Sequence, residues 1–213
     1  MKKMEGKKLK SIYIDELFEK SVTFAKELFF TGKIFIYPTD TIYGLGGNPF
    51  NREAVRRIND IKGRDKSKQF IWLVSDLDVI MNYAEINYES HLQFLKSIYP
   101  ASVSVVLNLN KKTINSVGYS SAAFRIPDQN FCTMLLSGIN LPLISTSVNK
   151  SGQNALNDYN AIEKEFSEDV DALFYTKSKI KPIASTIIDL TAEKPKLIRE
   201  GTIKFVDLLE KFN

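Results

Sequence analysis

The sequence predicts a single α/β domain. Segments with the apolar period of a helix alternate along the whole chain with short runs of β-branched and aromatic residues. No internal repeat, low-complexity linker or change of composition divides the 213 residues, which are enough for one substantial core. The pattern does not distinguish a mixed sheet from a parallel one. We expect a basic N-terminal tail over residues 1–10 and the folded domain over residues 11–213.

The first elements are the most clearly delimited. Residues 15–30 repeat apolar side chains at near-helical spacing, and Gly32 supplies the stop. Residues 34–37 have strand composition and end at Pro38, which cannot donate to a ladder. Asn51 can cap a helix that runs through Ile61 and ends at Gly63.

The rest of the chain continues the alternation. Residues 110–121 are polar and predict a loop, and a second polar loop covers 146–157. A helix over 130–137 is expected to end at Gly138. The remaining expected helices are 76–84, 89–98, 160–166 and 204–211, and the expected strands are 70–74, 102–109, 122–126, 141–147, 173–175, 185–190 and 197–199.

Small polar residues and glycines follow the strand at 34–37. The segment from Pro38 to Gly47 reads PTDTIYGLGG. Because glycine lets a backbone approach a ligand closely, this segment predicts a binding loop at a strand end. We expect Asp40 to brace that loop through backbone N–H groups. An ordinary strand–loop–helix unit is the alternative.

Two cations flank the end of the helix that begins at Asn51. Lys62 and Arg64 stand on either side of Gly63, where they suit the helix macrodipole and also make a compact anion clamp. The spacing of the glycines fits neither a P-loop nor a dinucleotide fingerprint.

A second polar cluster follows the apolar strand expected at 141–147. The run Ser145-Thr146-Ser147-Val148-Asn149 offers hydroxyl and amide groups suited to phosphate oxygens and a ribose. A Ser/Asn-rich turn is the alternative for this run alone.

Composition limits the class of protein. A net charge of +4 and a pI near 8.9 are compatible with anionic ligands such as nucleotides or RNA. One histidine, His91, and one cysteine, Cys132, argue against a protein-built zinc site. A single cysteine also excludes an internal disulfide and is typical of a reducing compartment, so we expect a cytoplasmic protein. The sequence offers no apolar run of transmembrane length and no signal-peptide segment, and we expect no membrane association.

Six segments in order resemble the signature of the YrdC-like family, the threonylcarbamoyl-AMP synthases of tRNA modification. They are PTDTIYGLGG, the Lys62-Gly63-Arg64 element, YPASVSVVL at 99–107 with Ser104 where the family usually has Thr, FRIPDQ at 124–129, STSVN at 145–149, and the closing segment from ASTIIDL to REG at 184–201. The resemblance implies one twisted mixed-sheet α/β domain around a deep, positively charged cleft. It also implies the short form, without the additional C-terminal domain of the long form. Asp65, Gln69 and Leu73 depart from the family pattern.

The resemblance further implies the reaction and its residues. L-threonine, bicarbonate and ATP would give L-threonylcarbamoyl-AMP and pyrophosphate for the t6A modification of tRNA, with Mg²⁺ carried on the triphosphate and no protein-built metal site. Partners would be tRNA-modification proteins that use the product, with a weak tRNA contact. The implied sites are catalytic Lys62 and Arg64; ATP-binding Arg64, Lys68, Ser104, Ser147, Asn149 and Arg199; and threonine-binding Thr41, Ser145 and Ser185.

Two other functions stay open from the sequence. A non-catalytic module that binds double-stranded RNA or tRNA could use the same basic cleft, although the cations are grouped with hydroxyls and not with aromatic stacking platforms. A carbamoyltransferase relative would use carbamoyl phosphate, but such relatives have metal-binding cysteines that this sequence lacks.

Overall fold

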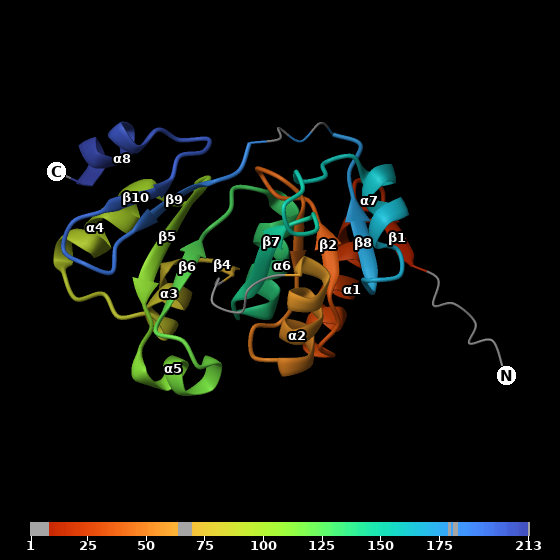
Figure 1. Cartoon of the computed structure of the whole chain (residues 1–213), viewed down its shortest axis with the longest axis horizontal. Helices are drawn as coiled ribbons and strands as arrows, with labels where there is room; N and C mark the ends of the chain where they lie inside the picture. The colour runs from red at the N-terminus through yellow and green to blue at the C-terminus, as the bar shows by residue number, and fades with distance from the viewer. Residues whose placement is uncertain (1–8, 64–69, 179, 181–182, 213) are drawn as a thin grey trace, which may run out of the picture.

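The computed structural model describes residues 9–63, 70–178, 180 and 183–212 (Figure 1). The strands are β1 (Lys10–Tyr13), β2 (Phe35–Tyr37), β3 (Gly44–Gly46), β4 (Ile71–Leu73), β5 (Val103–Asn108), β6 (Ser121–Arg125), β7 (Leu143–Ser147), β8 (Ala172–Tyr175), β9 (Thr186–Asp189) and β10 (Lys196–Arg199). The helices are α1 (Phe18–Phe30), α2 (Arg52–Lys62), α3 (Leu77–Tyr83), α4 (Glu89–Ile98), α5 (Lys111–Val117), α6 (Asn130–Ile139), α7 (Tyr159–Phe166) and α8 (Phe205–Phe212).

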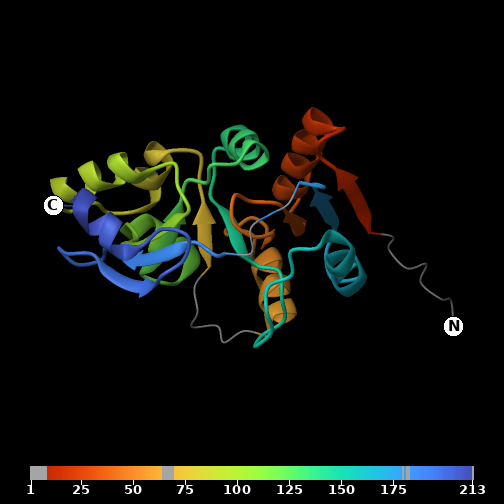
Figure 2. The ribbon, with the colours of Figure 1, turned by 90° about the horizontal axis from the view of Figure 1, so that it is seen from above.

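The strands form one mixed sheet in the order β1-β8-β2-β3-β7-β4-β6-β5-β9-β10. β8 pairs in parallel with both β1 and β2, whereas β3 pairs antiparallel with β2 and β7. The first half of the sheet contains β1, β8, β2, β3 and β7, and the second half contains β4, β6, β5, β9 and β10. β4 joins the two halves, because it pairs antiparallel with β7 of the first half and parallel with β6 of the second. Seen from above, β1 and α8 lie at opposite ends of the molecule (Figure 2). The mixed twisted sheet agrees with the fold class predicted from the sequence.

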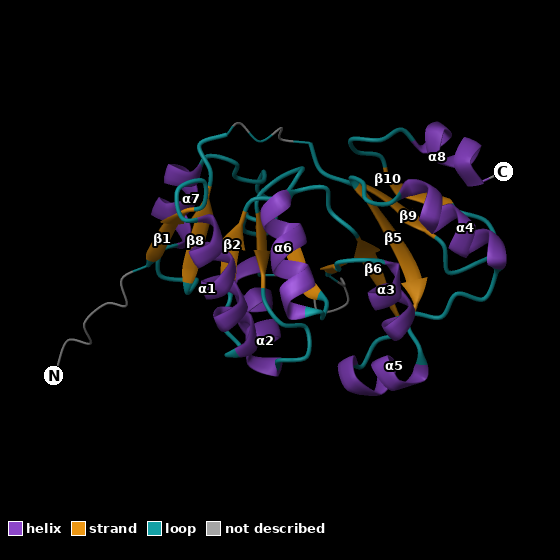
Figure 3. Ribbon diagram, turned by 180° about the vertical axis from the view of Figure 1, so that it is seen from behind, coloured by secondary structure: helices purple, strands orange, loops and turns teal. Residues whose placement is uncertain are grey.

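Three apolar clusters hold the helices to the sheet. In the first half, α1 and α6 pack with Phe35 and Tyr37, while α2 and α7 pack with Ile34 and Ile36 on the opposite face. In the second half, α3, α4 and α8 contribute to one cluster that includes Trp72. Figure 3 shows these three helices at the end of the molecule that contains β5, β6 and β9. The first half of the sheet is therefore covered on both faces.

Most predicted elements are present, with ends that differ by up to three residues. The predicted helix at 15–30 begins at Phe18, and the Asn51 cap is confirmed, because its side chain accepts from the backbone N–H of Ala54 at 2.9 Å. The loop prediction for 110–121 is wrong over most of its length, because Asn110 caps the short helix α5. The predicted end at Gly138 is also wrong, since α6 continues to Ile139 and Asn140 takes the left-handed position with φ 49°.

The glycines after β2 were expected to let the backbone approach a ligand closely, and for Gly44 and Gly46 this reason is wrong. Gly44 and Gly46 belong to β3, between β2 and β7. A Cβ on Gly46 would lie 2.0 Å from the carbonyl oxygen of Ile144 and 3.0 Å from the Tyr37 ring. These glycines therefore permit close packing of protein against protein.

The structure also contains a strand that the sequence did not predict. β1 runs in parallel beside β8, with Lys10 opposite Ala172. The first residue of β1 thus falls within the range expected to be tail.

Candidate functional site

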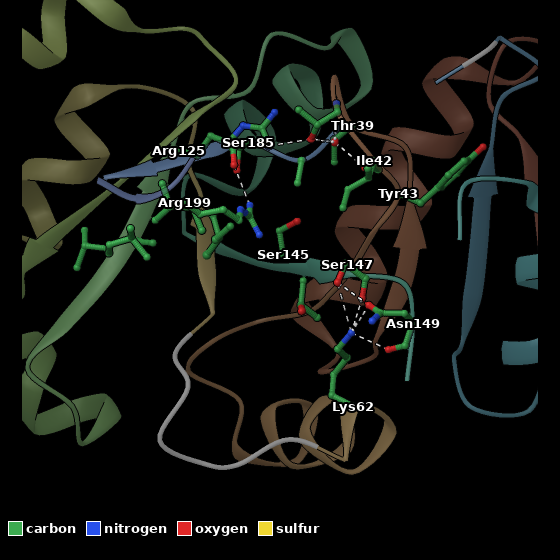
Figure 4. Close-up of a pocket in the computed structure, with 18 of the residues that line it drawn as sticks. Thr39, Ile42, Tyr43, Lys62, Arg125, Ser145, Ser147, Asn149, Ser185 and Arg199 are labelled. Atoms are coloured by element: carbon green, nitrogen blue, oxygen red, sulfur yellow. Dashed lines mark hydrogen bonds between the residues drawn. The ribbon is translucent and has the colours of Figure 1, made fainter. Parts of the chain in front are cut away.

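A cavity of about 510 Å³ lies where the two halves of the sheet meet. Its lining comes from the segment after β2, the end of α2, β7 and the loop after it, the strands β4, β5 and β6, and the segments around β9 and β10. Lys62, Arg125 and Arg199 are the charged residues among the described residues that line it (Figure 4).

Lys62 stands at the wall of the cavity nearest β7. Its side chain is buried, and its Nζ donates to the carbonyl oxygen of Ser147 at 2.8 Å. Nζ also donates at 2.6 Å to both the carbonyl oxygen and the Oδ1 of Asn149. Because α2 ends at Lys62 and β7 ends at Ser147, the helix terminus and the strand terminus meet here.

Arg125 stands on the opposite side of the cavity, at the end of β6. Its guanidinium forms a buried ion pair with the Asp40 carboxylate, and Nη1 donates to Thr41 Oγ1 at 3.0 Å. Ser102 Oγ donates to the other Asp40 oxygen at 2.7 Å. The expected contact of Asp40 with backbone N–H groups is therefore wrong: its carboxylate holds a buried arginine.

Ser185 and Arg199 complete that side. Arg199 Nη2 donates to the carbonyl oxygen of Ser185 at 2.8 Å. Partial burial, and next the charge of Arg125, lower the pKa of Arg199 from its ordinary value. Ser185 is buried, and its Oγ lies 3.0 Å from Ser104 Oγ.

The structure brings most of the predicted site residues to one cavity. Those that line it are Thr41, Lys62, Ser145, Ser147, Asn149, Ser185 and Arg199. Ser104 is fully buried and lies outside the lining, with its Oγ 3.0 Å from that of Ser185. Arg64 and Lys68 fall outside the described residues.

Arg125 lines the cavity but was not among the residues predicted for the site. The FRIPDQ segment stood out as a motif, but an arginine two residues before a proline carries no signal of burial in a cavity. Its charge in an otherwise apolar strand was the available signal, because a buried charge needs a partner such as Asp40.

Among the described residues, neither a cluster of metal-binding side chains nor a membrane-spanning helix is found. Within the described ranges, no group of three or more His, Cys, Asp or Glu residues could hold a metal ion. In the same ranges no helix has both the length and the apolar character needed to cross a bilayer.

Comparison with known proteins gives consistent matches. The model of the Sua5/YciO/YrdC family, described as "Telomere recombination", matches residues 27–201. A putative threonylcarbamoyl-AMP synthase of Methanocaldococcus jannaschii is 32% identical over 202 residues, covering 93% of this chain and 96% of that protein. The threonylcarbamoyl-AMP synthase of Pyrococcus abyssi is 25% identical and is matched over 83% of this chain, which spans 53% of its length.

Solved structures agree on the fold. P. abyssi Sua5 in complex with L-threonine matches with a TM-score of 0.81 at 24% identity, over 91% of this chain and 57% of that one. Escherichia coli YciO matches with a TM-score of 0.79 at 22% identity, over 92% and 94% of the two chains.

Proposed function

The chain belongs to the Sua5/YciO/YrdC family, and we propose that its cavity makes L-threonylcarbamoyl-AMP from L-threonine, bicarbonate and ATP, releasing pyrophosphate and water. The names of two relatives and the solved complex of P. abyssi Sua5 with L-threonine support this. The observation that carries the proposal is the convergence in one cavity of three cations with the hydroxyls of Thr41, Ser145 and Ser185. The product would then pass to tRNA-modification proteins.

The wall around Lys62 is proposed to bind the nucleotide. The Lys62 ammonium offers positive charge to phosphate oxygens. Its N–H groups donate to Ser147 and Asn149 in this structure, so hydrogen bonds to a phosphate or a ribose would form in exchange for those contacts. Arg64 and Lys68 follow α2 directly in the sequence and are proposed to add charge there. Mg²⁺ would enter on the triphosphate as part of the substrate.

The wall around Arg125 is proposed to bind the amino acid. Its guanidinium suits a carboxylate, and Thr41 and Ser185 offer hydroxyls on either side. Ser145 lines the cavity between the two walls, as Figure 4 shows. We assign Ser104 a positioning role through Ser185 in place of the expected contact with ATP.

The chemistry needs positioned charge more than a covalent intermediate. The threonine amine attacks bicarbonate, water leaves, and a carbamate forms. A carbamate oxygen then attacks the α-phosphorus of ATP, and the bond from that phosphorus to the bridging oxygen of pyrophosphate breaks. Lys62 and Arg199 would neutralise the charge that develops on the phosphate oxygens.

The experiment is an assay of pyrophosphate release with all three substrates and with each left out in turn. Lys62→Ala should lower the rate by about 10²–10³-fold while the protein remains folded. Lys150→Ala is the matched control, because Lys150 is exposed, lies in the loop after β7 and does not line the cavity. Equal turnover in wild type and Lys62→Ala would contradict the assignment.

A further inference from the structure

A chain of hydroxyl groups runs along the cavity wall just after β2. Thr39 and Thr41 are both buried and both line the cavity, and their Oγ1 atoms lie 3.0 Å apart. Thr39 Oγ1 also lies 2.6 Å from the carbonyl oxygen of Ile42, and it accepts from the backbone N–H of Thr41 at 3.1 Å.

The single proton of each hydroxyl can be assigned from these contacts. A carbonyl oxygen only accepts, so Thr39 must donate its proton to Ile42. Thr39 then has no proton left for Thr41, and the bond between the two hydroxyls must run from Thr41 to Thr39. The direction of the chain is therefore fixed by a backbone carbonyl.

The same count limits what Thr41 can offer to a ligand. Its proton goes to Thr39, and one of its two lone pairs accepts from Arg125 Nη1 at 3.0 Å. The second lone pair is what remains for the cavity. Toward a ligand, Thr41 acts as a hydrogen-bond acceptor.

We propose that Thr39 is a positioning residue that fixes Thr41 as an acceptor, so that Thr41 binds the amine of the amino-acid substrate and not its carboxylate. This inference rests on the proposed function of the cavity. A carboxylate oxygen has no proton to give to Thr41, and it finds its donors on Arg125 next door. The amine is joined to the same carbon as the carboxylate, so it is the donor closest to a carboxylate held by Arg125.

The test is calorimetric titration of L-threonine into five proteins: wild type, Thr39→Val, Thr39→Ser, Thr41→Val and the double variant Thr39→Val/Thr41→Val. Thr39→Val keeps the shape and removes the hydroxyl, which frees the proton of Thr41. We expect it to weaken binding about 10-fold, as for the loss of a hydrogen bond to a charged group. Thr39→Ser should restore binding, and Thr39→Val should add nothing in the Thr41→Val background.

L-2-aminobutyrate serves as a second ligand, because it keeps the amine and the carboxylate but lacks the side-chain hydroxyl of threonine. Thr39→Val should weaken its binding by the same factor. Sensitivity for L-threonine alone would show that Thr41 meets the side-chain hydroxyl, and it would overturn the assignment to the amine.

The remaining outcomes separate this inference from the proposed function. Two results would overturn the role of Thr39 and leave the proposed function standing. One is unchanged binding of L-threonine by folded Thr39→Val, and the other is an equal loss of affinity on Thr39→Val substitution in the wild type and in Thr41→Val. Failure of wild type to bind either amino acid would overturn both. If Thr39→Val does not fold, Thr39→Ala removes the same hydroxyl with less bulk, and thermal melts establish which variants enter the comparison.

Discussion

Asp40 shows how much one carboxylate contributes where charge is buried. Its side chain is 11% exposed and that of its partner Arg125 is 5% exposed. Removal of one member of such a pair leaves the other charge without compensation, which costs about 3–5 kcal/mol. For Asp40→Ala we expect this loss in the free energy of unfolding, or a melting temperature lower by roughly 10 °C, measured by thermal and urea denaturation.

An exposed ion pair gives the matched comparison. Glu53 and Arg56 form one at 2.6 Å on the surface of α2, with 60% and 61% of their side chains exposed. Glu53→Ala should leave the melting temperature unchanged, because water and salt screen such pairs. Equal effects of the two substitutions would mean that burial does not set the strength of the Asp40 contact.

Cys132 gives a second prediction at this scale. Burial, with a smaller contribution from Asp40, raises the pKa of its thiol. The unfolded chain therefore loses the thiol proton near pH 8.5 while the folded chain keeps it. The contribution of the thiol to the free energy of unfolding is fully present below that pH. As pH rises above it, this contribution falls by at most about 1.4 kcal/mol per pH unit.

The measurement compares urea unfolding of wild type and Cys132→Ala from pH 7 to about pH 10. Above about pH 8.5, the free energy of unfolding of wild type should fall relative to that of Cys132→Ala. A constant difference across the range would show that the thiol titrates alike in both states.

At the scale of elements, β3 depends on having no side chain at Gly46. A Cβ there would lie 2.0 Å from the carbonyl oxygen of Ile144, and backbone cannot rotate away as a side-chain end can. Gly46→Ala should therefore separate β3 from β7 and cost about 1–3 kcal/mol or more in the free energy of unfolding. Because β7 carries Ser145 and Ser147, binding of L-threonine and ATP should weaken as well.

Gly138→Ala is the control for that substitution. Gly138 lies inside α6, and the nearest atoms to a new Cβ belong to the flexible end of Lys26. Alanine should stabilise this helix by up to about 1 kcal/mol. Destabilisation by both substitutions would mean that the crowding at Gly46 is not the cause.

Elements that carry their own cap or period could be predicted from the sequence, and those that depend on distant partners could not. α2 was recognisable from Asn51 and its apolar face. β1 exists because β8, far along the chain, offers an edge to pair with, and β3 exists because Tyr37 and Ile144 pack against its glycines. α5 was missed because its polar composition resembles that of a loop.

For the whole molecule, the resemblance predicted a set of site residues, but not how these residues contact one another. Thr41, Ser147 and Arg199 meet in one cavity because the two halves of the sheet join through β7 and β4. Contacts such as those of Asp40 with Arg125 and of Ser104 with Ser185 link residues far apart in the chain, and no local pattern encodes them.

Ligand binding should therefore stabilise both halves together. At about 100-fold excess over its Kd a ligand adds about 2.7 kcal/mol to the free energy of unfolding, which raises the melting temperature by roughly 5–10 °C. We expect this shift with MgATP and L-threonine, and we expect Lys62→Ala to lose the response to MgATP. A module that only binds RNA would behave in the opposite way. Structured RNA would stabilise it strongly at low salt and weakly at high salt, and MgATP with L-threonine would leave its melting temperature unchanged.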